Sequence, residues 1–108
     1  MTLPEIKTLL EGISGFDKKV VYYAWAEGQA PPLPFIVYFE EGINPMSADG
    51  INYYNAKQIT IELYAQNKDL TSEAAVEAAL TAAGIFYSKI EEYLEDEKVF
   101  ETIYEIEV

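Results

Sequence analysis

The chain has 108 residues with no cysteine and no histidine, and its formal net charge is −12, from 19 acidic and 7 basic residues. Disulfides, thiolate nucleophiles, histidine bases and the commonest metal ligands are therefore excluded. The acidic excess is opposite to what nucleic acid or an anionic membrane surface attracts, so we expect neither as a partner. The length, with 50% hydrophobic residues, predicts a single domain over residues 1–108.

The N-terminal segment has the pattern of an amphipathic helix over residues 3–12. Thr2 and Glu5 match a capping box, and Pro4 is tolerated in a first helical turn. Leucine and isoleucine then recur on one face, and glycines end the segment. We expect this helix to cover a sheet. The segment lacks the basic start and apolar core of a signal peptide, which predicts a cytoplasmic protein.

Two β-forming segments, residues 19–26 and 34–40, flank a proline-rich connector. The prolines between residues 31 and 34 cannot donate hydrogen bonds to a sheet, so they end the first strand and orient the second. Both strands carry apolar or aromatic residues on both faces. This predicts either burial of both faces or one face packed inside the subunit and one against a neighbour. For the second case we assign Trp25 and Tyr38 to the interface.

Residues 41–55 are rich in turn formers and predict a long loop. The loop contains the adjacent pair Tyr53 and Tyr54, and it is too apolar for an idle linker. We expect the loop to be mobile in an isolated subunit. In an assembly we expect it to order against a neighbouring subunit through these two tyrosines.

The second half of the chain predicts a strand, a helix and a terminal hairpin. Residues 57–66 alternate as a half-buried antiparallel strand. Residues 71–83 carry a stripe of small apolar residues typical of a helix lying close to a sheet, and either Asp69 or Thr71 is expected to cap it. Residues 85–94 and 98–108 form the hairpin around an acidic turn. The prediction is an α+β fold of order α-β-β-β-α-β-β, with two helices packed on a mixed, mainly antiparallel sheet of about five strands. The side chains predicted to be buried are Leu9, Ile59, Ile61, Leu63, Val76, Leu80 and Tyr104.

No pattern of residues indicates catalysis or metal binding. The serines have no histidine to activate them, and no phosphate-binding glycine loop is present. The acids fit neither an EF-hand spacing nor a distinct pair for glycoside hydrolysis. Aromatic side chains can stack on bases, but such a site also needs a basic groove. We therefore expect no enzyme activity, no cofactor and no metal.

Three glutamates share one face of the last predicted strand: Glu101, Glu105 and Glu107. Glu91 could join them across the hairpin. One interpretation is a solvated outer face, which is the usual position of charge runs. A second interpretation depends on the family resemblance described next.

Several segments resemble one known family. They are TLPEIKTLLEGI, EGQAPPLPFIVYFEE, SADGINYY, KQITIELYAQNKD and EDEKVFETIYEIEV, and together they cover most of the chain. In these segments the chain resembles the small tail-terminator, or tail-completion, proteins of long non-contractile-tailed phages and prophages of Gram-positive bacteria. The resemblance implies a structural virion protein that forms a homo-oligomeric ring, commonly a hexamer. The ring caps the tail tube and joins it to the head. In such a ring, Glu101, Glu105 and Glu107 are candidates to line the channel that passes DNA, because a basic lining would bind the DNA and retain it.

The resemblance also implies partners and a location. The partners are further copies of the chain, the major tail tube protein and head–tail connector proteins. The location is the host bacterial cytoplasm during assembly and then the head–tail junction of the virion. Two alternatives remain, which are another head–tail connector component and an acidic binding module that mimics DNA to inhibit a basic protein. A mimic needs its carboxylates on one continuous face, whereas the acids are dispersed along this sequence.

Overall fold

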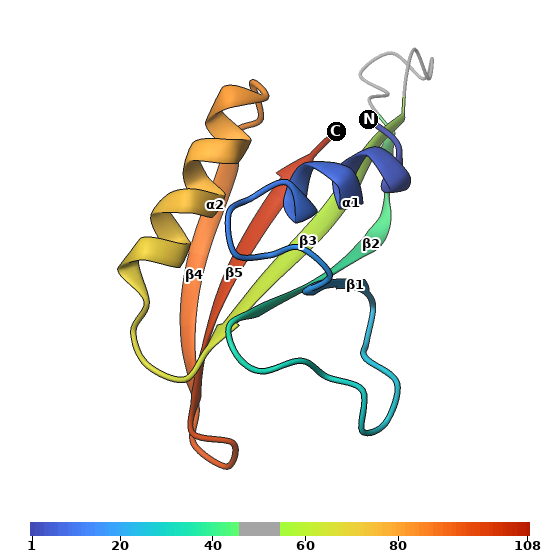
Figure 1. The fold of residues 1–108 in the computed structure, drawn as a ribbon. Coiled ribbons are helices and arrows are strands. Elements are labelled where there is room, and N and C mark those ends of the chain that lie inside the picture. The colour runs from blue at the N-terminus through green and yellow to red at the C-terminus, as the bar shows by residue number, and fades with distance from the viewer. Residues whose placement is uncertain (46–54) are drawn as a thin grey trace.

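The computed structural model describes residues 1–45 and 55–108. Two helices lie on one face of a single five-stranded sheet (Figure 1). The elements are α1 (Leu3–Glu11), β1 (Val20–Tyr22), β2 (Phe35–Pro45), β3 (Asn55–Ala65), α2 (Leu70–Ala82), β4 (Tyr87–Leu94) and β5 (Val99–Glu107). This confirms the predicted α+β class and the order α-β-β-β-α-β-β. Tyr53 and Tyr54, and most of the loop predicted over residues 41–55, lie outside the described residues.

The sheet is mixed, with the spatial order β1-β2-β3-β5-β4. β1 pairs with β2 in parallel, and every other neighbouring pair is antiparallel. The hairpin of β4 and β5 therefore joins the sheet through β5, which lies beside β3. β1 and β4 are left as the two outer strands.

Local signals in the sequence explain where the helices begin. In α1 the Thr2 side chain accepts a hydrogen bond from the Glu5 amide, and the Glu5 carboxylate accepts one from the Thr2 amide at 2.7 Å. This is the predicted capping box. In α2 the Asp69 carboxylate accepts a hydrogen bond from the Ser72 amide at 3.0 Å, which confirms Asp69 of the two candidate caps. The helix begins at Leu70, one residue before the predicted position.

The core lies between the helices and one face of the sheet. Ile6 and Leu10 of α1 and Val76 and Leu80 of α2 pack on alternate residues of the central strands. Every side chain predicted to be buried is buried, except Leu9, which is partly buried at the edge of the core. Alternation in β3 and β5 therefore located the core correctly.

Two predicted strand ends differ most from the structure. The first strand was expected over residues 19–26, but it ends at Tyr22 because Tyr23 adopts a positive φ of 72° and the Ala24 amide bonds back to the Tyr22 carbonyl. The second strand was expected to end near residue 40, but it continues to Pro45. It pairs with β3 across a bulge between Glu40 and Gly42, so both ends of the predicted loop belong to strands.

Candidate functional site

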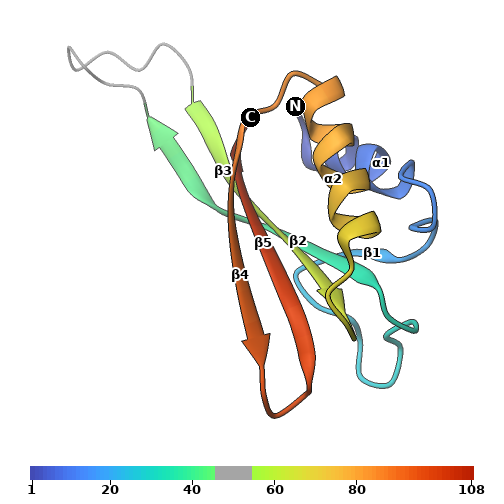
Figure 2. The ribbon, with the colours of Figure 1, turned by 90° about the vertical axis from the view of Figure 1, so that its left-hand side faces the viewer.

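The sheet face that points away from both helices is the main candidate for function (Figure 2). We call it the open face. It is identified by alternation, because the residues that do not contact the helical core point to the other side. It carries five glutamates and no lysine among the described strand residues. Its side chains are Val21, Phe35, Val37, Phe39, Gln58, Thr60, Glu62, Tyr64, Ser88, Ile90, Glu92, Leu94, Val99, Glu101, Ile103, Glu105 and Glu107.

At the centre of the open face, two carboxylates share one tyrosine. The Tyr64 hydroxyl lies 3.0 Å from Glu62 Oε1 and 2.9 Å from Glu101 Oε2. A hydroxyl has one proton and donates to one acceptor at a time. The second contact is a good hydrogen bond when one carboxyl is protonated and donates to the hydroxyl oxygen. The geometry therefore suits a pair of acids that shares a proton.

The electrostatics agree with this geometry. Burial, followed by the hydrogen bond and the charge of Glu101, raises the pKa of Glu62 from 4.5 to about 7. Glu92 lies opposite Glu101 in the register of β4 and β5, and its charge raises the pKa of Glu62 further. Burial and the two carboxylates also raise the pKa of Tyr64, which keeps its hydroxyl proton in place as a donor.

The predicted channel-lining acids divide into two groups. Glu105 and Glu107 are exposed on the open face, as the alternation predicted. Glu101 shares that face but is only 6% exposed, because Tyr64 and the neighbouring strands cover it. Glu91 does not join them, since it pairs with Thr102 and points to the helix side. Its neighbour Glu92 takes that place on the open face.

An aromatic row borders the acid pair. The Trp25 ring, from the connector, meets Phe35 edge-on at 5.8 Å between centroids, and Phe35 lies 5.4 Å from Tyr64. Trp25 is half-buried, and its Nε1 is enclosed without a hydrogen-bond partner among the described residues. The Thr60 hydroxyl is likewise buried and unpartnered there. Buried polar groups normally have hydrogen-bond partners, and these two lack them among the described residues.

Tyr38, the other aromatic predicted at an interface in this region, lies elsewhere. It points to the helix side, is 3% exposed, and packs edge-on against Tyr22 with 5.2 Å between ring centroids. Its side chain belongs to the subunit core, so it is left out of the interface proposed below. Tyr53 and Tyr54 fall outside the described residues.

The helix side carries a contrasting cluster of charges between α2 and β4. Lys89 Nζ lies 2.8 Å from Glu73 Oε1 and 2.7 Å from Glu77 Oε2. Lys68 pairs with Glu73 at 2.7 Å and also with Glu91. We call these five residues the ion-pair cluster. Its acids have lysines beside them, whereas Glu62 and Glu101 at the centre of the open face share a tyrosine.

The ion-pair cluster holds its acids in the ionised form. Burial opposes the charge of Glu73, but the two lysines outweigh burial and hold the pKa of Glu73 below its usual value. The same balance lowers the pKa of Glu77, which also accepts a hydrogen bond from the Tyr104 hydroxyl at 2.8 Å. The hydrogen bonds to Glu73 and Glu77 raise the pKa of Lys89.

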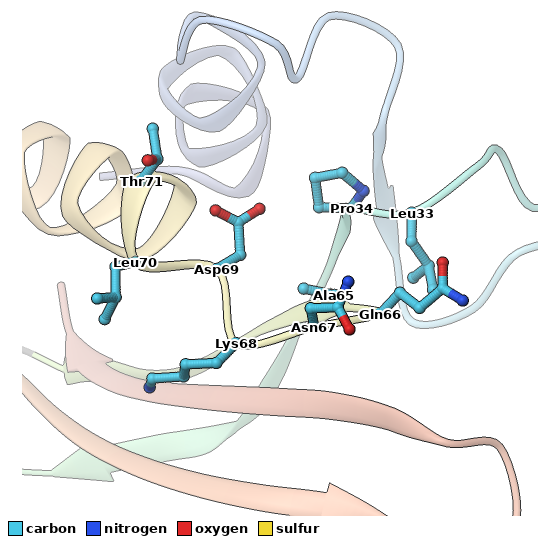
Figure 3. A pocket seen from close by; sticks show the side chains of 9 residues that line it. All are labelled: Leu33, Pro34, Ala65, Gln66, Asn67, Lys68, Asp69, Leu70 and Thr71. Carbon is cyan, nitrogen blue, oxygen red and sulfur yellow. The ribbon is translucent and has the colours of Figure 1, made fainter.

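A pocket of about 550 Å³ lies between the proline connector and the β3–α2 turn (Figure 3). Its lining residues are Leu33, Pro34, Ala65, Gln66, Asn67, Lys68, Asp69, Leu70 and Thr71. The Asp69 carboxylate is engaged as the helix cap, and Lys68 points away from Pro34 toward the ion-pair cluster. The pocket therefore contains no convergent pair of reactive groups.

Two features of functional sites are absent from the described residues. No three acidic side chains are grouped so that they could hold a metal ion. Neither helix is long and apolar enough to cross a membrane.

In comparisons with known proteins, no family model matches the chain and no curated protein matches it significantly.

Sequence reasoning missed the acid pair and the ion-pair cluster. Alternation in the sequence places Glu62 and Tyr64 on one face of β3, so the contact between these two residues could have been predicted. The contact with Glu101 depends on β5 lying beside β3 in a register that sets Tyr64 against Glu101. Nothing in the local sequence specifies that neighbour, and the same holds for Lys89 reaching Glu73 across from β4 to α2.

Proposed function

We propose that this protein is a structural virion protein without catalytic activity. It forms a ring of identical subunits, commonly six, that caps a phage tail tube and joins it to the head. The observation that carries the proposal is the open face, which has aromatic and apolar side chains at one end and five glutamates, with no lysine among the described strand residues, at the other. This composition joins a protein-binding surface to a DNA-repelling one, and the sequence resemblance described above points the same way.

The aromatic end of the open face suits contact with another protein. Phe35, Phe39 and Trp25 are only partly buried, and aromatic residues are enriched where proteins meet. The enclosed Trp25 Nε1 lacks a partner within the described part of the subunit. A neighbouring subunit, the tail tube protein or a connector protein that packs here would cover this row.

The acidic end suits the wall of a channel. Glu92 and Glu105 are exposed, and the described strand residues place no lysine on the open face to offset them. A wall of this kind releases no counterions from DNA and so creates no affinity for it. Its repulsion acts over about 8 Å at physiological salt, which keeps passing DNA away from the wall. Glu101 contributes through its charge on Glu62 more than by direct contact.

The proposal is tested in assembled particles. The variant Glu92→Lys with Glu105→Lys reverses two exposed charges on the open face and leaves the buried Glu101 intact. The matched control, Glu95→Lys with Glu97→Lys, reverses two exposed charges in the hairpin turn. Both variants should form rings, and only the first should slow DNA ejection, more strongly at low salt. Equal ejection by the two variants would contradict the channel, and purified protein that forms no ring and binds no tail tube would contradict the function.

A second candidate is an acidic module that mimics DNA and binds a basic protein. The gathering of Glu62, Glu92 and Glu105 on one face supports it, because the sequence alone showed these acids as dispersed. The two candidates differ in assembly. A mimic acts as a small complex whose affinity for its basic partner falls steeply with salt, whereas the proposed function requires rings visible by electron microscopy.

A further inference from the structure

The outer strand β4 leaves one of its edges unpaired within the described residues. β4 has eight residues and bonds only to β5, whereas β1 at the other end of the sheet has three residues. Figure 2 looks onto the free edge of β4, with α2 beside it and not across it. A strand edge of this length presents a row of free backbone donors and acceptors to any strand that approaches.

The side chains of β4 are more apolar than a solvated edge requires. Ile90, in the middle of the strand, is 52% exposed, and Tyr93 is 49% exposed. Phe86, which immediately precedes β4, is 94% exposed. An exposed edge that also carries large apolar side chains is a site for strand addition.

We propose that β4 pairs with β4 of a second copy of this chain, antiparallel and centred on Ile90. A two-fold axis through Ile90, perpendicular to the sheet, joins the two sheets and keeps the helices on the same side. Residues equally far before and after Ile90 then lie opposite each other. Lys89 faces Glu91 of the second copy on the helix side, and the symmetry repeats this pair. Tyr87 faces Tyr93 of the second copy, and the two Ile90 side chains meet at the axis.

Charge selects this register over its neighbours. Moving the centre to Lys89 sets the two lysines opposite each other, and moving it to Glu91 or Glu92 sets two glutamates opposite each other. Directly opposed like charges destabilise a sheet, while opposite charges and aromatic pairs stabilise it. A centre at Ser88 avoids a clash but pairs only the first residues of the strand. The register centred on Ile90 uses nearly all of β4 and contains no like-charged pair.

The rest of the subunit permits this contact. Apart from Leu70, the exposed side chains of α2 are small, among them Ala74, Ala78 and Thr81, so a second copy can bring its own α2 close. The ion-pair cluster lies on the same side, and Glu91 of the second copy adds another acid beside Lys89. An isologous pair does not close a ring, which needs head-to-tail contacts. The β4 pair is therefore a contact of the free protein, additional to the proposed ring and independent of it.

The absence of natural cysteine makes a direct test possible. In Ile90→Cys, the two introduced thiols meet at the axis, at a spacing between paired residues that a disulfide can span. Mild oxidation of the folded protein should give a covalent dimer. Glu92→Cys is the control, because it is exposed on the same strand but lies away from its own copy. A mixture of Ser88→Cys and Glu92→Cys should cross-link as a heterodimer, since these positions face each other.

The equilibrium is measured by sedimentation of the protein without cysteine. The unmodified chain should show a concentration-dependent dimer, and Ile90→Lys should weaken it at least tenfold by placing two ammonium groups at the axis. Tyr23→Lys, at an exposed aromatic far from β4, should leave the dimer unchanged. A chain that stays monomeric at high concentration, or an Ile90→Cys variant that cross-links no faster than Glu92→Cys, would overturn the proposal.

Discussion

Two pairs of acids lie on opposite sides of one sheet, and the pKa of Glu62 in one pair shifts in the opposite direction from the pKa values of Glu73 and Glu77 in the other. Glu73 and Glu77 on the helix side lie beside lysines, which lower the pKa of both carboxyls. Glu62 and Glu101 on the open face share a tyrosine instead, and the pKa of Glu62 rises to about 7. Both pairs are partly or fully buried, so burial alone does not explain the difference. The neighbours decide whether a buried acid keeps its charge.

The two sides of the sheet differ in whether lysines balance their acidic side chains. The ion-pair cluster balances its acids within the subunit and ties α2 to β4. The open face carries five glutamates and no lysine among the described strand residues, and an excess of like charge does not stabilise a single chain. We infer that the role of this charge lies in contact with, or repulsion from, something outside the subunit. The following changes test each half of this contrast.

Removing a cation from the ion-pair cluster should have the largest effect. Among the described residues, Lys89→Met leaves the buried Glu73 with Lys68 alone and leaves Glu77 without a cation, so we expect a loss of about 2 kcal/mol in the free energy of unfolding. Urea unfolding at pH 7 measures it. Lys7→Met, on the exposed side of α1, is the control and should change stability by less than about 0.5 kcal/mol. Equal losses in the two variants would show that the cluster is only a solvated surface.

Removing an acid from the open face should have the opposite sign. The folded pKa of Glu62, about 7, lies above its usual 4.5, so the folded state keeps a proton that the unfolded chain loses. Stability therefore falls as pH rises through this window. Glu62→Gln should raise the free energy of unfolding by about 1–2 kcal/mol at pH 8, after allowance for partial solvent screening, and change it little at pH 4.

The control for this change is Glu105→Gln, which removes the same charge from an exposed position on the same face. It should stabilise the protein less than Glu62→Gln at pH 8. The measurement is chemical denaturation across the pH range from 4 to 8. A Glu62→Gln variant that is equally destabilised at every pH would mean that Glu62 acts as an ordinary ionised carboxylate.

Removing the shared hydroxyl should have the smallest effect on stability and a clear effect on titration. Tyr64→Phe deletes the donor between Glu62 and Glu101 and should cost about 1 kcal/mol. The hydroxyl also lowers the pKa of Glu62, so its loss should move that pKa above about 7. Carboxyl resonances followed by NMR report the titration. An unchanged pKa would mean that the hydroxyl does not bridge the two carboxyls in solution.

The sequence predicted the elements and the core because both follow local rules. The capping box gave the correct first residue of α1, and the predicted last residue is one too far. Alternation in β3 identified the buried Ile59, Ile61 and Leu63. The first strand was predicted too long because composition does not reveal the positive φ of Tyr23. The bulge after Glu40 was not predicted either, because it depends on how β2 pairs with β3.

The candidate site was only half visible, because its parts meet through the topology of the sheet. Glu101 and Glu105 were correctly placed on one face of the last strand. Whether each would be covered or exposed depended on Tyr64 reaching across from β3, a contact between residues 37 positions apart in the chain. The sequence analysis expected Glu91 to join these glutamates, but Glu92 does so. The register of the hairpin decides which of the two lies on the open face, and the local sequence does not specify that register.

The shared proton of Glu62 couples the open face to whatever covers it. A surface that packs on this face removes more water from Glu62 and strengthens its preference for the neutral form. Covering the face and binding the proton therefore favour each other, and by linkage the coupling is reciprocal. The proton then acts as a ligand of the covered state. Its uptake can be counted by calorimetry in buffers of different ionisation heat, which reports coverage of this face without a label on either partner.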